Sequence, residues 1–120
     1  MPYFFDTYAI IELLQGNSNY LRFKETENFT SIFNLIELHY KILKDFGEDE
    51  AFIKTLIFRK WIIKVKMKHI FQANIFRLKN KEKKLSFTDC LGYIMAKSMK
   101  IKFLTGDMQF KDMENVEFLR

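Results

Sequence analysis

The 120-residue sequence contains few of the residues that cross-link a chain, break its helices or bend its backbone. Its one cysteine, Cys90, can form neither an intramolecular disulfide nor a zinc site by itself, and its simplest role is that of a small buried apolar residue. One proline and four glycines leave little room for long linkers and favour helices joined by short connections. No run of about 18 apolar residues is present, and residues 1–5 lack the charged region of a signal peptide. We therefore expect a soluble, cytoplasmic protein that has no membrane partner.

The hydrophobic content is high: 48% of the residues are hydrophobic and 14 residues are phenylalanine. Such a composition lies far from that of disordered chains. A length of 120 residues suits one domain built around one core. We therefore predict a single domain over residues 1–120.

The positive charge of the chain is concentrated in one segment. The formal net charge is +5, but residues 1–53 carry −5, residues 54–84 carry +10, and residues 85–120 are neutral. A basic block of this kind is a candidate binding surface for a polyanion. A solvated helical face would explain the same charges, and the sequence leaves both interpretations open.

The spacing of apolar residues predicts strands that alternate with helices. Predicted strands lie at residues 2–5, 27–30, 61–65, 102–105 and 116–119, and predicted helices at residues 6–16, 31–46, 48–58, 68–84 and 86–99. The segment 61–65 has β-branched character, although a helix would also fit it. The alternation predicts an α/β sandwich with a mainly parallel central sheet of four or five strands.

Four acidic residues stand at positions suited to a shared site. Asp6 and Asp107 each follow a predicted strand, and the carboxyl ends of parallel strands meet at one edge of a sheet. Asp89 lies in the first turn of a predicted helix, and Glu37 interrupts a helical segment that is otherwise rich in Ile and Leu.

Each of these acids also has a simpler explanation. Asp6 would cap the helix that follows it, and Asp89 would complete a capping box. Glu37 would pair with Lys41 one helical turn later, and Asp107 would stabilise a turn. Taken singly, three of the four acids are better explained in this way.

Together with their neighbours, the acids resemble the pattern of the PIN-domain nucleases, and most closely the VapC-type toxin ribonucleases of toxin–antitoxin pairs. The segments that carry the resemblance are Phe4-Phe-Asp6-Thr7, Asn34-Leu-Ile-Glu37-Leu38, Leu85-Ser-Phe-Thr-Asp89-Cys90 and Phe103-Leu-Thr-Gly-Asp107-Met-Gln-Phe110. Tyr8 stands where the family often has Asn, and Cys90 stands where it usually has Ala. Residues 45–84 match the family only in their helical character.

The resemblance implies a PIN-like α/β/α sandwich whose active site consists of Asp6, Glu37, Asp89 and Asp107. Four converging carboxylates repel one another without a cation, and ligands that are all oxygen suit Mg²⁺, with Mn²⁺ as an expected substitute. Asp6, Asp89 and Asp107 would contact the metal. Glu37 would either bind it or orient the attacking water. The expected reaction is the hydrolysis of RNA phosphodiester bonds by a metal-dependent endoribonuclease.

Other residues are expected to support this site. Thr7 and Thr105 would hold a carboxylate or a water molecule, and Asn34 would face the same cleft. The basic segment would supply phosphate contacts. Its main candidates for RNA binding are Arg59, Lys60, Lys64, Lys66 and Lys68.

The resemblance also implies protein partners, because VapC-type proteins are typically homodimers that a cognate antitoxin inhibits. Phe46, Phe52 and Phe58 would suit a dimer or antitoxin interface, although a place in the core would explain them equally well. The alternative function is that of a PIN-fold protein without catalytic activity, which binds RNA or another protein.

Overall fold

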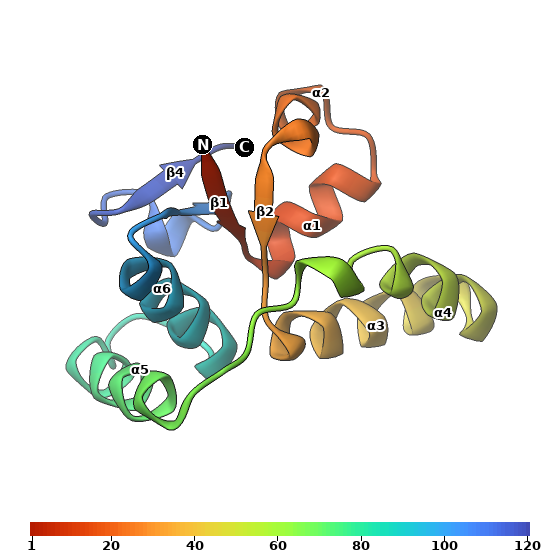
Figure 1. Cartoon of the computed structure of the whole chain (residues 1–120). Helices are drawn as coiled ribbons and strands as arrows, with labels where there is room; N and C mark the ends of the chain where they lie inside the picture. The colour runs from red at the N-terminus through yellow and green to blue at the C-terminus, as the bar shows by residue number, and fades with distance from the viewer.

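A parallel sheet of four strands lies between two groups of helices in the computed structural model, which describes residues 1–120 (Figure 1). The strands are β1 (Pro2–Phe5), β2 (Glu27–Phe29), β3 (Lys102–Thr105) and β4 (Val116–Phe118), in the spatial order β2-β1-β3-β4. The helices are α1 (Thr7–Leu14), α2 (Ser18–Leu21), α3 (Ile32–Phe46), α4 (Glu48–Leu56), α5 (Met67–Lys79) and α6 (Phe87–Met99), with short 3₁₀ turns η1 (Arg22–Glu25), η2 (Arg59–Trp61) and η3 (Met108–Phe110). Every strand pair is parallel. The predicted α/β class and the sheet of four or five strands are confirmed.

Alternate side chains of β1 enter two different cores. Tyr3 and Phe5 pack with residues of α1, α3 and α4, such as Leu38. Phe4 points to the other face and packs with residues of α6, such as Leu91. Figure 1 shows the corresponding layers, with α5 and α6 on one side of the sheet and α1 to α4 on the other. A strand that is covered on both faces needs a continuous apolar run, which explains the aromatic sequence before Asp6.

The prediction of a strand at residues 61–65 is wrong. Only one residue pairs there: the backbone N–H of Thr30 donates to Trp61 O at 2.9 Å, and that of Ile63 donates to Thr30 O at 3.0 Å. The pairing cannot continue because Ser31 caps α3, so the chain leaves the sheet directly after Thr30. The β-branched segment therefore has no partner strand beyond one residue.

Helix α5 ends at Lys79, earlier than the predicted residue 84. The side-chain Nδ2 of Asn80 donates to Phe76 O at 2.9 Å, which satisfies a carbonyl in the last turn of the helix. The backbone N–H of Lys83 then donates to Asn80 O at 2.9 Å and closes a turn. Residues 80–86 therefore form a short basic connection to α6 rather than a further turn of helix.

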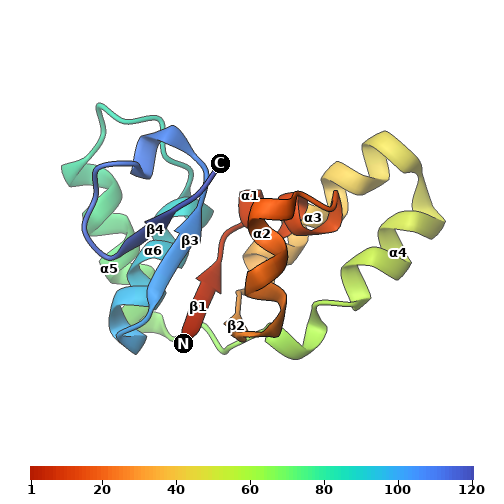
Figure 2. The ribbon, with the colours of Figure 1, turned by 90° about the horizontal axis from the view of Figure 1, so that it is seen from above.

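Strands β1 and β3 end at the same edge of the sheet, called the carboxyl edge below. Figure 2 shows both strands pointing toward the side of the molecule where the connection 80–86 lies. The connection 62–66 lies on the opposite side in the same view. The two ends of α5 therefore lie at different edges of the molecule. None of the helices is both long enough and apolar enough to cross a membrane.

Candidate active site

Asp6 lies at the carboxyl end of β1 and is 3% exposed. Its Oδ1 accepts a hydrogen bond from the backbone N–H of Ala9 at 2.8 Å, which caps α1, and its Oδ2 accepts one from the hydroxyl of Thr105. Burial raises the pKa of the Asp6 carboxyl to about 8, although both hydrogen bonds favour the charged form. The capping role that the sequence offered as an alternative is therefore present, but it leaves a carboxylate buried at the sheet edge.

Thr105, at the end of β3, links Asp6 to Asp107. Its hydroxyl donates to Asp6 and accepts from the backbone N–H of Asp107 at 3.0 Å. The Oδ1 of Asp107 accepts from the backbone N–H of Gln109 at 3.0 Å and caps the turn η3. One threonine hydroxyl thus positions two acidic residues that are far apart in the sequence.

Glu37 lies on α3 and is held by a chain of hydrogen bonds that joins α1 to the start of α3. The hydroxyl of Thr7 donates to Glu37 Oε1 at 2.6 Å and accepts from Asn34 Nδ2 at 3.1 Å. The hydroxyl of Ser31 in turn donates to Asn34 Oδ1 at 2.7 Å. Burial raises the pKa of the Glu37 carboxyl, and the hydrogen bond from Thr7 opposes that rise. Lys41, the simpler partner for Glu37, forms its ion pair with Asp45 instead.

Asp89 lies in the first turn of α6 and forms the predicted capping box. Its Oδ2 accepts from the backbone N–H of Ser86 at 2.9 Å, and its own N–H donates to Ser86 Oγ at 3.1 Å. Burial raises the pKa of the Asp89 carboxyl, Asp107 adds to the rise, and the positive charge of Arg77 opposes it. The capping box fixes Asp89 on the side of α6 that faces the other acids.

The four acids influence one another electrostatically. The negative charges of Asp89 and Asp107 help to raise the pKa of Asp6, and that of Asp89 helps to raise the pKa of Glu37. As they stand, no three Asp, Glu, His or Cys side chains lie close enough together to hold one metal ion. The donors nevertheless fit a hard divalent cation by their chemistry, because all of them are carboxylate oxygens that repel one another and are partly withdrawn from water.

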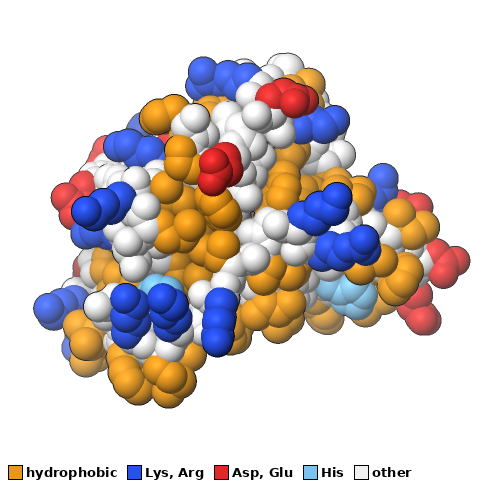
Figure 3. All heavy atoms as spheres, viewed as in Figure 1, with side chains coloured by type: hydrophobic (Ala, Val, Ile, Leu, Met, Phe, Trp, Pro, Cys, Tyr) orange, Lys and Arg blue, Asp and Glu red, His pale blue; other side chains and the backbone are white.

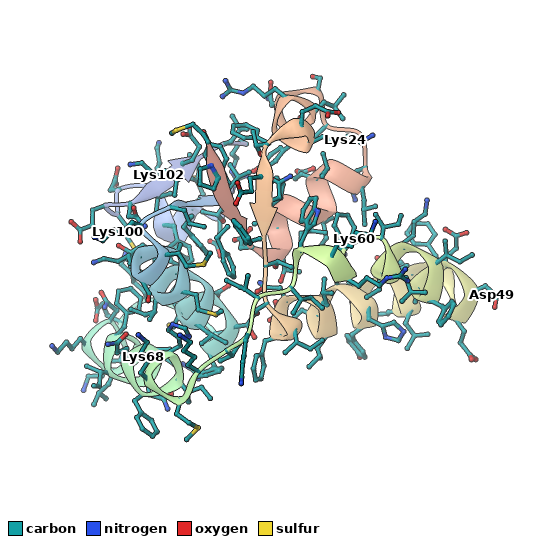
Figure 4. The ribbon with its side chains drawn as sticks, viewed as in Figure 1. Lys24, Asp49, Lys60, Lys68, Lys100 and Lys102 are labelled. Carbon is teal, nitrogen blue, oxygen red and sulfur yellow. The ribbon has the colours of Figure 1, made fainter.

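The five residues predicted to bind RNA lie away from these acids. Arg59 and Lys60 belong to η2, Lys64 and Lys66 to the connection 62–66, and Lys68 to the start of α5. Figure 4 shows Lys60 and Lys68 on the face turned to the viewer, and Figure 2 places η2 opposite the connection 80–86. None of the five forms an ion pair with an acidic residue. The structure does not bring them to the carboxyl edge, and their contact with RNA stays a prediction.

One protein family matches this chain over nearly its whole length. The family model described as the PIN domain matches residues 3–116. The chain belongs to the PIN domain family. The resemblance drawn from the four acidic motifs is thus confirmed at the level of the family. No curated protein matches the chain in sequence.

Solved structures of toxin–antitoxin proteins are similar to this PIN domain. The sarcin–ricin loop-cleaving toxin VapC20 of Mycobacterium tuberculosis has a TM-score of 0.74 at 18% identity, over 96% of this chain and 98% of that one. VapBC2 of Rickettsia felis, bound to a promoter DNA fragment, has a TM-score of 0.73 at 21% identity, over 99% and 98%. A toxin–antitoxin complex of Klebsiella pneumoniae has a TM-score of 0.72 at 20% identity, over 96% and 95%. At these identities the likeness shows a shared fold.

Tyr8, which departs from the PIN-domain pattern, packs next to the site. A Cβ on Gly106 would overlap the ring of Tyr8 and would lie 2.5 Å from the carbonyl oxygen of Leu119. The guanidinium of Arg120 lies 5.9 Å from the centre of the same ring, and its Nε donates to Gly106 O at 3.1 Å. Glycine is therefore required between Thr105 and Asp107 because the Tyr8 ring occupies the space that a side chain would need.

Two further residues of the PIN domain contact the acids and were not predicted. The Thr88 side chain lies close to Glu37 and lowers the pKa of its carboxyl, and Thr88 directly precedes Asp89 in the sequence. Gln109 contributes only its backbone N–H to Asp107. No sequence pattern reveals such a contact, because any residue except proline can make it.

Proposed function

We propose that this PIN domain is a Mg²⁺-dependent endoribonuclease, with Mn²⁺ able to substitute, and that it acts as the toxin of a toxin–antitoxin pair. The observation that carries the proposal is Asp6, a buried carboxylate whose pKa burial raises to about 8 and on which two further carboxylates act. When ionised, such an arrangement destabilises a folded chain unless a cation neutralises it. Strongly shifted pKa values that come from burial and neighbouring charges are typical of functional sites.

The proposed roles follow from the contacts of each acid. Asp6, Asp89 and Asp107 would hold the ion, which when bound would supply Lewis-acid stabilisation of the phosphate. Thr105 would hold Asp6 and Asp107 in position relative to each other, because its hydroxyl contacts both residues. Glu37, which Thr7 holds, would orient the attacking water, and burial raises its pKa, which is the direction that helps a carboxylate to accept a proton.

The test replaces Asp89 with asparagine and measures both ion binding and cleavage. We expect calorimetric Mn²⁺ binding to be lost and Mg²⁺-dependent cleavage of structured RNA to fall more than about a hundredfold, since even the loss of a group that only orients a ligand costs up to about that much. Asp112→Asn, which changes an exposed acid outside the site, is the matched control and should behave as the wild type. Unchanged cleavage in Asp89→Asn would contradict the proposal.

A non-catalytic PIN domain is the second candidate function. It is favoured by the lack of three acidic side chains close enough to hold one ion as the chain stands. This candidate predicts that the wild-type protein binds RNA, that it does not bind Mn²⁺, and that RNA remains intact when Mg²⁺ or Mn²⁺ is added. Cleavage by the wild type that Asp89→Asn abolishes would exclude it.

The toxin part of the proposal is supported by the similar toxin–antitoxin structures and by an apolar groove that an antitoxin segment would fill. The groove has a volume of about 290 Å³, lies between α1, α3 and α4, and is lined by Ile11, Leu14, Leu38, Ile42 and Phe46 among others. Expression in bacterial cells should arrest growth, and Asp89→Asn should relieve the arrest. Equal growth of cells that express either protein would contradict the toxin assignment.

A homodimer is proposed from the apolar side chains that this chain leaves exposed. Ile36 and Tyr40 on α3 and Phe71 on α5 are each more than half exposed, and Figure 3 shows hydrophobic side chains along the lower edges of both helices. Phe46 and Phe52 are also exposed, whereas Phe58 is 2% exposed and packs against Trp61 in the core. Light scattering should give the mass of a dimer, and Ile36→Glu should give that of a monomer.

A further inference from the structure

An open basic hollow lies where α5 ends and the connection 80–86 begins. Its volume is about 480 Å³. Four of its seven lining residues are cationic, namely Arg77, Lys81, Lys83 and Lys84, and Asn74 adds an amide. No acidic residue lines it. The hollow therefore presents positive charge and hydrogen-bond donors beside the apolar side chains of Leu78 and Leu85.

The four cations of this hollow have no carboxylate partner. The two ion pairs of the chain join Lys41 to Asp45 and Lys97 to Glu114, and both lie elsewhere. Like charges that are held near one another destabilise the fold, and the effect is stronger when the backbone that carries them is fixed. The connection is fixed, because it is closed by its own turn and tied to η3. An anion that entered the hollow would relieve this repulsion.

Hydrogen bonds tie the hollow to the loop that carries Asp107. The Nζ of Lys83 donates to Gln109 O at 3.1 Å, and the backbone N–H of Lys84 donates to Gln109 Oε1 at 3.4 Å. The backbone N–H of Gln109 donates to Asp107 Oδ1. On the other side of the hollow, the charge of Arg77 acts on Asp89. The cations therefore stand directly beside the acidic cluster, on the same edge of the sheet.

We propose that this hollow binds a backbone phosphate of the RNA strand, next to the phosphate that the acidic cluster cleaves. The inference rests on the proposed nuclease function and names the part of the chain that holds its substrate. An Arg fork and Lys point charges suit phosphate oxygens, and the open shape lets the strand continue on both sides. Binding there offsets the repulsion that the acids exert on a polyanion, and it carries little sequence information.

The test compares two double variants that remove the same charge from opposite ends of α5. Lys81→Gln/Lys84→Gln changes exposed residues of the hollow, whereas Lys60→Gln/Lys68→Gln changes exposed residues on the other side of the molecule. The probe is a short fluorescein-labelled single-stranded RNA, and its binding is followed by anisotropy in EDTA at several salt concentrations. Each RNA phosphate that a variant no longer neutralises should reduce the steepness of log K against log salt by about 0.7.

We expect Lys81→Gln/Lys84→Gln to weaken RNA binding and flatten the salt slope more than Lys60→Gln/Lys68→Gln, which changes two of the residues that the sequence predicted to bind RNA. Equal effects of the two pairs, or a larger effect of Lys60→Gln/Lys68→Gln, would overturn the inference. So would a loss of affinity for poly-glutamate without a loss for RNA, because the hollow would then be a protein-binding site. A wild type that binds RNA but does not cleave it with Mg²⁺ or Mn²⁺ would refute the nuclease function alone, and the comparison of variants would still decide the phosphate site.

Discussion

Replacing Asp6 with asparagine should stabilise the metal-free protein while it removes a proposed metal ligand. Asp6 is 3% exposed, and burial raises the pKa of its carboxyl to about 8. At neutral pH the folded chain must therefore bury a negative charge or hold a proton that the unfolded chain would release. Asparagine has nearly the same shape, carries no charge and is a good N-cap residue, so it can still accept the hydrogen bond from Ala9.

The size of the effect follows from the two pKa values. The ordinary pKa of aspartate is 3.8, and each unit above it corresponds to about 1.36 kcal/mol. Because the folded chain binds the extra proton between about pH 4 and pH 8, its free energy of unfolding falls as the pH rises through that window. At pH 7 the buried Asp6 carboxyl lowers the free energy of unfolding of the wild type by about 4 kcal/mol. Asparagine avoids this cost, but its poorer hydrogen bond to Thr105 destabilises the variant by about 1 kcal/mol. We therefore expect Asp6→Asn to gain about 3 kcal/mol at pH 7.

Urea unfolding in EDTA, at several values between about pH 5 and pH 8, measures this gain. We compare the free energies of unfolding of the wild type and Asp6→Asn at each pH. Other groups, such as His69, whose pKa burial lowers, contribute almost equally to both proteins, so their contributions cancel in the difference. The difference should grow as the pH rises and shrink when Mg²⁺ is added, because the ion binds the folded wild type. Asp112→Asn, an exposed control, should change neither the free energy of unfolding nor its dependence on pH. If the free energies of unfolding of the wild type and Asp6→Asn differed by the same amount at every pH, burial of the Asp6 carboxyl would not be the cause of the difference.

Three substitutions test other parts of the site and its support. Thr105→Val removes the hydroxyl that contacts both Asp6 and Asp107, so RNA cleavage should fall and the free energy of unfolding in urea should drop by about 1–3 kcal/mol. Thr105→Ser keeps the hydroxyl, so its cleavage and its free energy of unfolding should stay close to those of the wild type. Gly106→Ala should lower the free energy of unfolding by about 1–3 kcal/mol, because the added Cβ meets the Tyr8 ring and the carbonyl oxygen of Leu119. A variant as stable as the wild type would contradict this packing. Phe58→Ala should cost about 3–5 kcal/mol in the same assay, and a loss below about 1 kcal/mol would show that this ring is not core.

The acids at the ends of strands could be predicted from the sequence because the signals are local. An aromatic run followed by Asp6, and Leu104-Thr-Gly followed by Asp107, each define a buried strand and the residue that leaves it. Parallel pairing then brings the two together without any further information. The strand predicted at residues 61–65 failed for the opposite reason. Its own residues favour a strand, but its length depends on Thr30, the last residue of a distant segment that is free to pair.

The basic segment shows a second limit of sequence reasoning. Its charges could be counted, but their placement depends on α5, whose 13 residues span about 20 Å from one edge of the molecule to the other. Lys68 at one end and Lys81 at the other therefore belong to different surfaces, although they are close in sequence. A charge count over a window has no access to this separation.

The simpler explanations of the acids and the proposed site are not in competition. Asp6 caps α1, Asp89 forms a capping box and Asp107 caps η3, as the simpler explanations predicted. Each cap uses a carboxylate oxygen and thereby fixes the side chain at the carboxyl edge. Glu37 is the exception: it caps no helix, its expected partner Lys41 pairs elsewhere, and Thr7 holds it from another element. A carboxylate that has no local structural role, held by a hydroxyl thirty residues away in sequence, is a second sign, beside the buried Asp6, that the cluster serves a purpose other than folding.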